Sequence, residues 1–169
     1  SGTKLDRFTR FDGPVTVALA GRVSPHADRE LDRLITRLRS EARLPVSRAP
    51  DGAPAQIVVE GITRRDLERV VPEAACFVLP TRVTWDEFRK NTRRRDLSWS
   101  TLQRREAVTI FIPVDIAPQE IRDCLHEEIA QALGPLNDLY RLEDSIFNDD
   151  NLHSVLTGFD MLILRTTYD

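Results

Sequence analysis

Long hydrophobic runs are missing from this chain of 169 residues, and none of its apolar stretches approaches the length of a membrane-spanning helix. A signal peptide is also missing, but the opening Ser1-Gly2 looks like the remnant of a cleaved tag, so that absence says nothing about location. Hydrophobic residues make up 41% of the chain and charged residues 30%, a balance typical of a globular domain. We therefore expect a flexible lead-in or tag remnant over residues 1–13 and a single domain over residues 14–169.

Cysteine is scarce, which excludes a disulfide-dense scaffold and a zinc finger. Cys76 and Cys124 form no C-x-x-C pair, and no histidine stands at zinc-finger spacing from them. Two isolated cysteines are usually buried thiols in a cytosolic protein and a disulfide in a secreted one. The residues by themselves leave both states open.

The net charge of −3 is small, but it hides an uneven distribution. Residues 1–105 carry 21 Lys and Arg against 14 Asp and Glu, whereas residues 106–169 carry 3 against 13. This predicts a basic face and an acidic face. The run Arg93-Arg94-Arg95 has no accompanying aromatic stacking pattern or known binding module, so we interpret it as a solvated loop and expect no nucleic-acid partner.

Hydrophobic periodicity predicts an α+β domain. Alternating or continuous apolar residues indicate strands over residues 14–20, 56–60, 75–79 and 107–112. Residues 45–54 are rich in turn formers, residues 90–103 are polar, and residues 139–155 form a long Asp- and Asn-rich stretch. A loop of that length in a compact domain usually forms the rim of a site.

Helix starts are marked by capping residues. Ser24-Pro25 begins an amphipathic helix to about residue 43, and Thr63 and Thr84 begin two short helices. Thr157 begins a final helix. That helix is expected to dock on the core through Phe159, Met161, Leu162 and Ile163.

The stretch over residues 117–138 organises the rest of the chain. Pro118 predicts a helix start and Gly134 its end, and the apolar residues between them recur at helical spacing. Glu128 falls inside this apolar stripe, while Glu127 and Gln131 lie together on one flank. A carboxylate among core positions must be neutralised, paired or used, because burial of the bare charge is costly.

This helix resembles the zinc-binding helix of metzincin peptidases, and of matrixins in particular, which carry H-E-x-x-H-x-x-G-x-x-H. The chain reads Glu127-Glu128-x-x-Gln131-x-x-Gly134-x-x-Asn137. The resemblance implies that Glu128 keeps the position of the general base, while Glu127, Gln131 and Asn137 replace the three histidine ligands. Downstream, Ser145-Ile146-Phe147 resembles the matrixin Ser-Ile-Met turn with Phe147 in place of methionine.

The resemblance implies an α+β, metzincin-like (zincin-like) domain. Its expected parts are a mixed twisted sheet, a long amphipathic helix, the central motif helix and a C-terminal helix. The loop after the motif helix would border the cleft. The loop and turn residues singled out are Asp138, Asp144, Phe147 and Asp149. Clusters of Asp and Asn make turns more often than calcium sites, and the spacing is not that of an EF-hand.

The segments RDCLHEEIAQALG and DSIFNDDN also resemble DUF2927, a bacterial domain-of-unknown-function family. That family is found mostly as envelope and lipoprotein-like proteins of Gram-negative bacteria. The resemblance implies a location in the periplasm or cell envelope, with a lipid anchor upstream as one route of attachment. It also favours a disulfide between Cys76 and Cys124, and an envelope protein or a cell-wall component as the partner.

The sequence leaves three functional interpretations: a non-catalytic recognition module, a metallopeptidase with unusual ligands and a zinc-free cell-wall hydrolase. Glu127, Gln131 and Asn137 offer one charge and two amide oxygens, a poor set for zinc, so we predict no metal and no cofactor. The retained cleft would then serve non-catalytic recognition in the envelope. The alternative is a hydrolase, either a metallopeptidase with unusual ligands or a zinc-free cell-wall hydrolase with Glu128 as general acid or base.

Further predictions concern the roles of Glu128 and of the residues expected near it. In a cell-wall hydrolase, Glu127, Asp138 or Asp144 would supply the second carboxylate. In the binding module, Glu128 is expected to be buried and hydrogen-bonded near Gln131 and residues 144–149. His126 projects about 160° away from Glu128 around the helix, so we expect a surface or hydrogen-bonded side chain rather than a ligand.

Overall fold

The computed structural model describes residues 10–22, 24–102, 104–134 and 158–168. The strands are β1 (Val15–Gly21), β2 (Val46–Arg48), β3 (Ile57–Ile62), β4 (Phe77–Leu79) and β5 (Val108–Pro113). The α-helices are α1 (Pro25–Ser40), α2 (Arg64–Val70), α3 (Trp85–Lys90), α4 (Pro118–Leu133) and α5 (Gly158–Tyr168). Two short 3-10 turns, Arg95–Leu97 and Trp99–Thr101, lie between α3 and β5.

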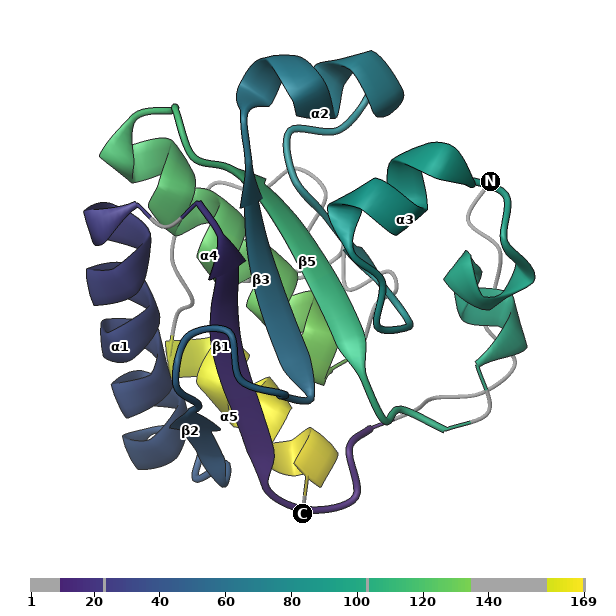
Figure 1. Cartoon of the computed structure of the whole chain (residues 1–169). Coiled ribbons are helices and arrows are strands. Elements are labelled where there is room, and N and C mark those ends of the chain that lie inside the picture. Colours follow the sequence, from purple (N-terminus) through teal and green to yellow (C-terminus); the bar gives the residue numbers. More distant parts are fainter. Residues whose placement is uncertain (1–9, 23, 103, 135–157, 169) are drawn as a thin grey trace.

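The five strands form one mixed sheet in the order β2-β1-β3-β5-β4 (Figure 1). Neighbouring strands are parallel except for β4, which runs antiparallel to β5 at one edge. The α+β class with a mixed sheet is therefore confirmed. The prediction of only turns over residues 45–54 is wrong, because Val46–Arg48 pairs with β1 from Val15 to Val17. So short a strand exists through this pairing rather than through its own hydrophobic pattern.

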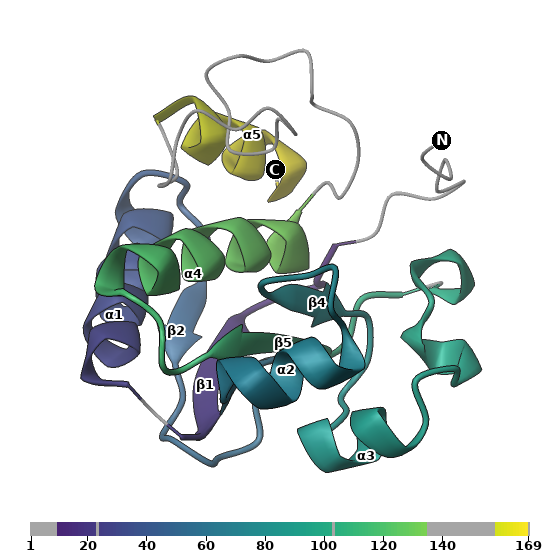
Figure 2. The same ribbon diagram turned by 90° about the horizontal axis from the view of Figure 1, so that it is seen from above.

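Helices α1, α4 and α5 lie on one side of the sheet, as the view from above shows (Figure 2). The main core fills this layer, with Leu31 and Leu34 from α1 and Leu125 and Ile129 from α4 fully buried. A second, aromatic cluster covers β4 and β5, and it includes Trp85 and Phe88 of α3, Phe77 and Phe111. β5 is buried along its whole length, which matches its continuous apolar run.

The predicted caps of three helices are confirmed. The hydroxyl of Ser24 accepts from the His26 amide at 3.2 Å, and that of Thr63 accepts from the Asp66 amide at 3.2 Å. Thr84 forms a full capping box with Glu87. α1 ends at Ser40, a little before the expected residue 43.

The C-terminal end of α4 is held by side chains from two other segments. The buried Arg105 guanidinium donates to the carbonyl oxygens of Gln131, at 2.9 Å, and Ala132. The Tyr168 hydroxyl of α5 donates to the carbonyl oxygen of Leu133. These donors satisfy carbonyl groups that a helix end leaves without partners. By holding this end of α4, the two side chains also fix the position of the rest of the helix.

α5 docks differently from the prediction. Met161 and Leu164 are buried, whereas Leu162 is 55% exposed and does not pack on the core. When a helix carries apolar residues on more than one side, only one side packs on the core, and tertiary packing selects that side. Thr157, the predicted cap, lies outside the described residues. Within the described ranges, no helix is both long and apolar enough to cross a bilayer.

Candidate binding pocket

A disulfide links Cys76, just before β4, to Cys124 in the middle of α4. Their Cα atoms are 6.0 Å apart, and the bond closes a loop of 48 positions. Cys124 is buried on the inner side of α4 and Cys76 is half-buried. The disulfide favoured by the family resemblance is therefore present, and it joins the edge of the sheet to the motif helix.

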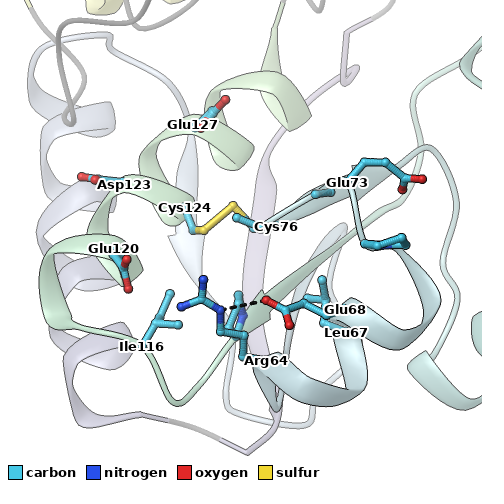
Figure 3. Close-up of a pocket in the computed structure, with 14 residues that line it drawn as sticks. Arg64, Leu67, Glu68, Glu73, Cys76, Ile116, Glu120, Asp123, Cys124 and Glu127 are labelled. Carbon is cyan, nitrogen blue, oxygen red and sulfur yellow. Dashed lines mark hydrogen bonds and ion pairs between the residues drawn. A yellow bond between two sulfur atoms is a disulfide. The ribbon is translucent and has the colours of Figure 1, made fainter.

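This disulfide forms one wall of a pocket of about 340 Å³. Helix α2 and residues 72–76 line one side, and the segment from Pro113 to α4 lines the other (Figure 3). The lining is mostly apolar, and it includes Leu67, Pro113, Ile116 and the disulfide. Because a covalent bond joins the two sides, we expect the pocket to keep its shape without a ligand.

The pocket is strongly acidic around its apolar lining. Of the described residues that line it, five are carboxylates and Arg64 is the single cation. The acidic residues are Glu68 of α2, Glu73, and Glu120, Asp123 and Glu127 of α4. Glu120 also accepts the Ala117 amide at 3.2 Å, as a first-turn acid that stabilises the start of α4.

Arg64 shows how a cation is held in this pocket. Its Nε donates to Glu68 Oε1 at 3.0 Å, the contact marked in Figure 3. This hydrogen bond, followed by the charges of Glu68, Glu120 and Asp115, raises the pKa of Arg64 above its usual value. The surroundings therefore stabilise a positive charge even on an exposed side chain.

Glu128, the acid inside the apolar stripe, lies behind this pocket rather than in it. The residue is 4% exposed and is not among those that line the pocket. Its Oε1 lies 3.8 Å from Cys76 Sγ, and its buried Oε2 has no hydrogen-bond partner within the described residues. Burial, followed by the neighbouring charge of Glu127, raises the pKa of Glu128 well above its usual value. Burial thus favours the protonated, neutral form of this carboxyl group.

His126 is buried at 4% exposure, so of the two expected states, surface or hydrogen-bonded, the surface position is wrong. α4 packs against α1 as well as against the sheet, and this contact covers the side of the helix opposite Glu128. Burial, with the charges of Arg37 and Arg122, lowers the pKa of His126 to about 4. His126 is therefore neutral at physiological pH and lies away from the pocket.

The structure brings only part of the predicted site together. Glu127 lines the pocket beside the disulfide, whereas Gln131 is half-buried and does not line it. The remaining predicted positions, Asn137, Asp138, Asp144, Phe147 and Asp149, lie outside the described residues. The contacts expected between Glu128 and residues 144–149 therefore stay a prediction. In the part of the chain that is described, no three His, Cys, Asp or Glu side chains converge closely enough to hold a metal ion.

The wall of the pocket opposite α4 was not predicted from the sequence. Arg64, Glu68 and Glu73 belong to a polar helix and a turn that carry no motif. The useful signal was Cys76, because its link to Cys124 brings residues 72–76 next to α4. Acidic residues within a few positions of either cysteine were therefore candidates for a site formed by both segments.

The family model described as "Protein of unknown function (DUF2927)" matches residues 1–169 of this sequence. The chain belongs to the DUF2927 family. No curated protein matches it in sequence. The pocket of this DUF2927 protein must therefore be interpreted from its own chemistry.

Proposed function

We propose that this DUF2927 protein is a non-catalytic, metzincin-like recognition module of the bacterial periplasm or envelope, and that the pocket beside the disulfide is its binding cleft. The observation that carries the proposal is the separation of two neighbouring acids on α4. Glu127, at a former ligand position, lines the pocket, whereas Glu128, at the position of the base, is buried behind it. A general base must reach the water or proton on which it acts. A carboxyl group that is 4% exposed and lies behind the pocket lining does not have that access.

The arrangement of elements supports the metzincin-like part of the proposal. A mixed sheet, a long amphipathic α1, the motif helix α4 and a C-terminal helix α5 occur in the order that the resemblance implies. Helix α4 ends at Leu133, and its C-cap Gly134 stands at the position of the glycine that ends the peptidase helix. There a Cβ atom would lie 2.9 Å from Leu164 Cδ2, so glycine also permits α5 to approach.

Restoring histidines at the former ligand positions tests this relationship. The variant Glu127→His, Gln131→His, Asn137→His should bind one zinc ion, because histidines at positions i and i+4 share a helix face and the third would return after Gly134. The wild type should bind zinc weakly or not at all, since amide oxygens compete poorly with water for this ion. Calorimetric titration of both proteins, with Glu127→His alone as control, gives the measurement. Failure of a folded triple variant to bind would count against metzincin-like geometry, and tight binding by the wild type against a lost site.

Site-directed cross-linking tests the recognition role. A photo-reactive residue in place of Glu73, which is exposed and lines the pocket, should capture an intact envelope partner in the native bacterium. The matched control replaces Glu41, an exposed acid at the end of α1 and outside the pocket. An intact partner seen only from position 73 is the expected result. Equal products from both positions would argue against a binding cleft here, and partner fragments that accumulate with time would argue for a hydrolase.

One observation favours the alternative of a zinc-free hydrolase. The raised pKa of Glu128 is what a general acid requires, and the pocket lies on the other side of the disulfide from it. Any reaction through Glu128 would need the carboxyl group to turn toward the pocket. Glu128→Gln should therefore abolish hydrolysis of a cell-wall or peptide substrate if this alternative holds, and leave partner binding unchanged if it does not.

A further inference from the structure

We infer that the pocket between α2 and α4 takes a single long basic side chain, arginine or lysine, presented by a polypeptide partner. This inference rests on the proposed function and names the chemistry of its partner. It starts from the apolar pocket rather than from its charge. At about 340 Å³ the pocket lies at the small end of ligand cavities, about 300–1,000 Å³. That size suits one side chain better than an extended glycan strand.

The lining matches the two parts of a basic side chain. Leu67, Pro113 and Ile116 provide an apolar surface for an aliphatic stem. Carboxylates occur on both sides of this apolar surface, with Glu73 on the side of α2 and Glu127 on α4 (Figure 3). Arginine and lysine combine an apolar stem with a charged end, and they normally lie across such a boundary.

The chain itself supplies an example of the expected contact. Arg64 places its guanidinium against Glu68 at 3.0 Å in this same pocket, and the acids around it favour the charged form. Among the described residues that line the pocket, five carboxylates stand against this one cation, so the lining carries a net negative charge. A guanidinium from a partner would extend the contact that Arg64 already makes with Glu68.

A metal ion is a poorer match than an organic cation. Calcium and magnesium require several oxygen ligands that converge within about 2.6 Å of one point. Among the described residues no such convergence of three acidic side chains occurs. Carboxylates spread around a pocket, over an apolar lining, instead suit a cation carried on a long stem.

Peptide binding tests the inference directly. The probe is a blocked Gly-Ser hexapeptide with one central arginine, and its control carries citrulline, which has the same shape without the charge. The arginine peptide should bind at least about tenfold more tightly by NMR titration, with amide shifts at Leu67, Cys76 and Glu120. A lysine peptide should also bind, less tightly because it cannot form bidentate contacts.

Matched variants locate the charge effect. Glu120→Gln with Glu127→Gln should weaken binding of the arginine peptide about three- to tenfold, and glutamine at position 120 still completes the cap of α4. Glu41→Gln with Glu106→Gln makes the same change in net charge at exposed residues outside the pocket, and should leave affinity unchanged. Equal loss in both double variants, or equal affinity for arginine and citrulline, would overturn the inference.

The outcomes also separate this inference from the proposed function. A peptidoglycan disaccharide-peptide that binds at the pocket, with no preference for the arginine peptide, would overturn the basic side chain and keep a recognition cleft. Cross-links from position 73 to an intact partner, without arginine-peptide binding, would have the same meaning. Loss of both position-specific cross-linking and all binding at the pocket would overturn the proposed function as well.

Discussion

Breaking the Cys76–Cys124 disulfide should lower the free energy of unfolding by about 4 kcal/mol, because the bond closes a loop of 48 positions and so restricts the unfolded chain. For a chain of this size that corresponds to a fall in the unfolding midpoint of about 8–16 °C. The pocket should loosen at the same time, since the bond joins its two sides.

Thermal unfolding of the wild type with and without a reductant gives the measurement, and the variant Cys76→Ala with Cys124→Ala gives the control. The double variant should melt near the reduced wild type and be insensitive to reductant. Mass measurement after alkylation of the unreduced protein checks the bond itself. Two alkylated thiols, or one midpoint under both conditions, would contradict the expectation.

Local signals predicted most elements correctly. The caps at Ser24, Thr63 and Thr84 and the bounds of α4 depend on short-range hydrogen bonds and on proline and glycine, which sequence displays directly. Strand β2 was missed because its three residues stand among turn formers, and only the partner strand β1 makes them a strand. The exposed side of α5 was misassigned for a related reason, since every turn of that helix offers apolar residues.

The candidate site was predictable only from the side of α4. The place of Glu128 within an apolar stripe correctly indicated burial, and the disulfide followed from the family resemblance. The group that contacts Glu128 could not be predicted from the sequence. Periodicity indicates which side of a helix is covered but not which residues cover it. Here Cys76 lies against Glu128, and this contact depends on the path of residues 72–76.

The two buried titratable residues of α4 should act on stability in opposite directions as the pH changes. The pKa of Glu128 is raised above 4.5 in the folded protein, so above pH 4.5 the unfolded chain has lost a proton that the folded chain keeps. Its contribution to stability therefore falls with rising pH, by about 1.4 kcal/mol per unit, up to its pKa in the folded state. It is fully present only below pH 4.5.

His126 has the reverse effect. Its pKa falls from 6.5 to about 4 on folding, so between these values the unfolded chain holds a proton that the folded chain lacks. Its contribution therefore rises with pH across that window and amounts to about 3 kcal/mol in total. Above pH 4.5, the slopes due to Glu128 and His126 should oppose each other in the wild type until the lower of two values is reached, pH 6.5 or the pKa of Glu128 in the folded protein.

Single variants should separate the two slopes. Relative to the wild type, the free energy of unfolding of Glu128→Gln should rise by about 1.4 kcal/mol per pH unit above pH 4.5. That of His126→Gln should fall by about the same amount per unit between pH 4 and 6.5. The slopes matter rather than the offsets, because a buried amide adds its own constant cost from hydrogen bonds that are not formed.

Urea unfolding from pH 4 to 7 measures both slopes against the wild type, and other titrating groups cancel in the comparison if the substitution leaves them unchanged. The double variant Glu128→Gln with His126→Gln should have the same slope as the wild type over the pH range in which both slopes operate. A flat difference for Glu128→Gln would mean that Glu128 ionises in the folded protein as it does in the unfolded one. Its carboxylate would then have to reach water or a cation, and Glu128 would regain the access that general acid or base catalysis requires.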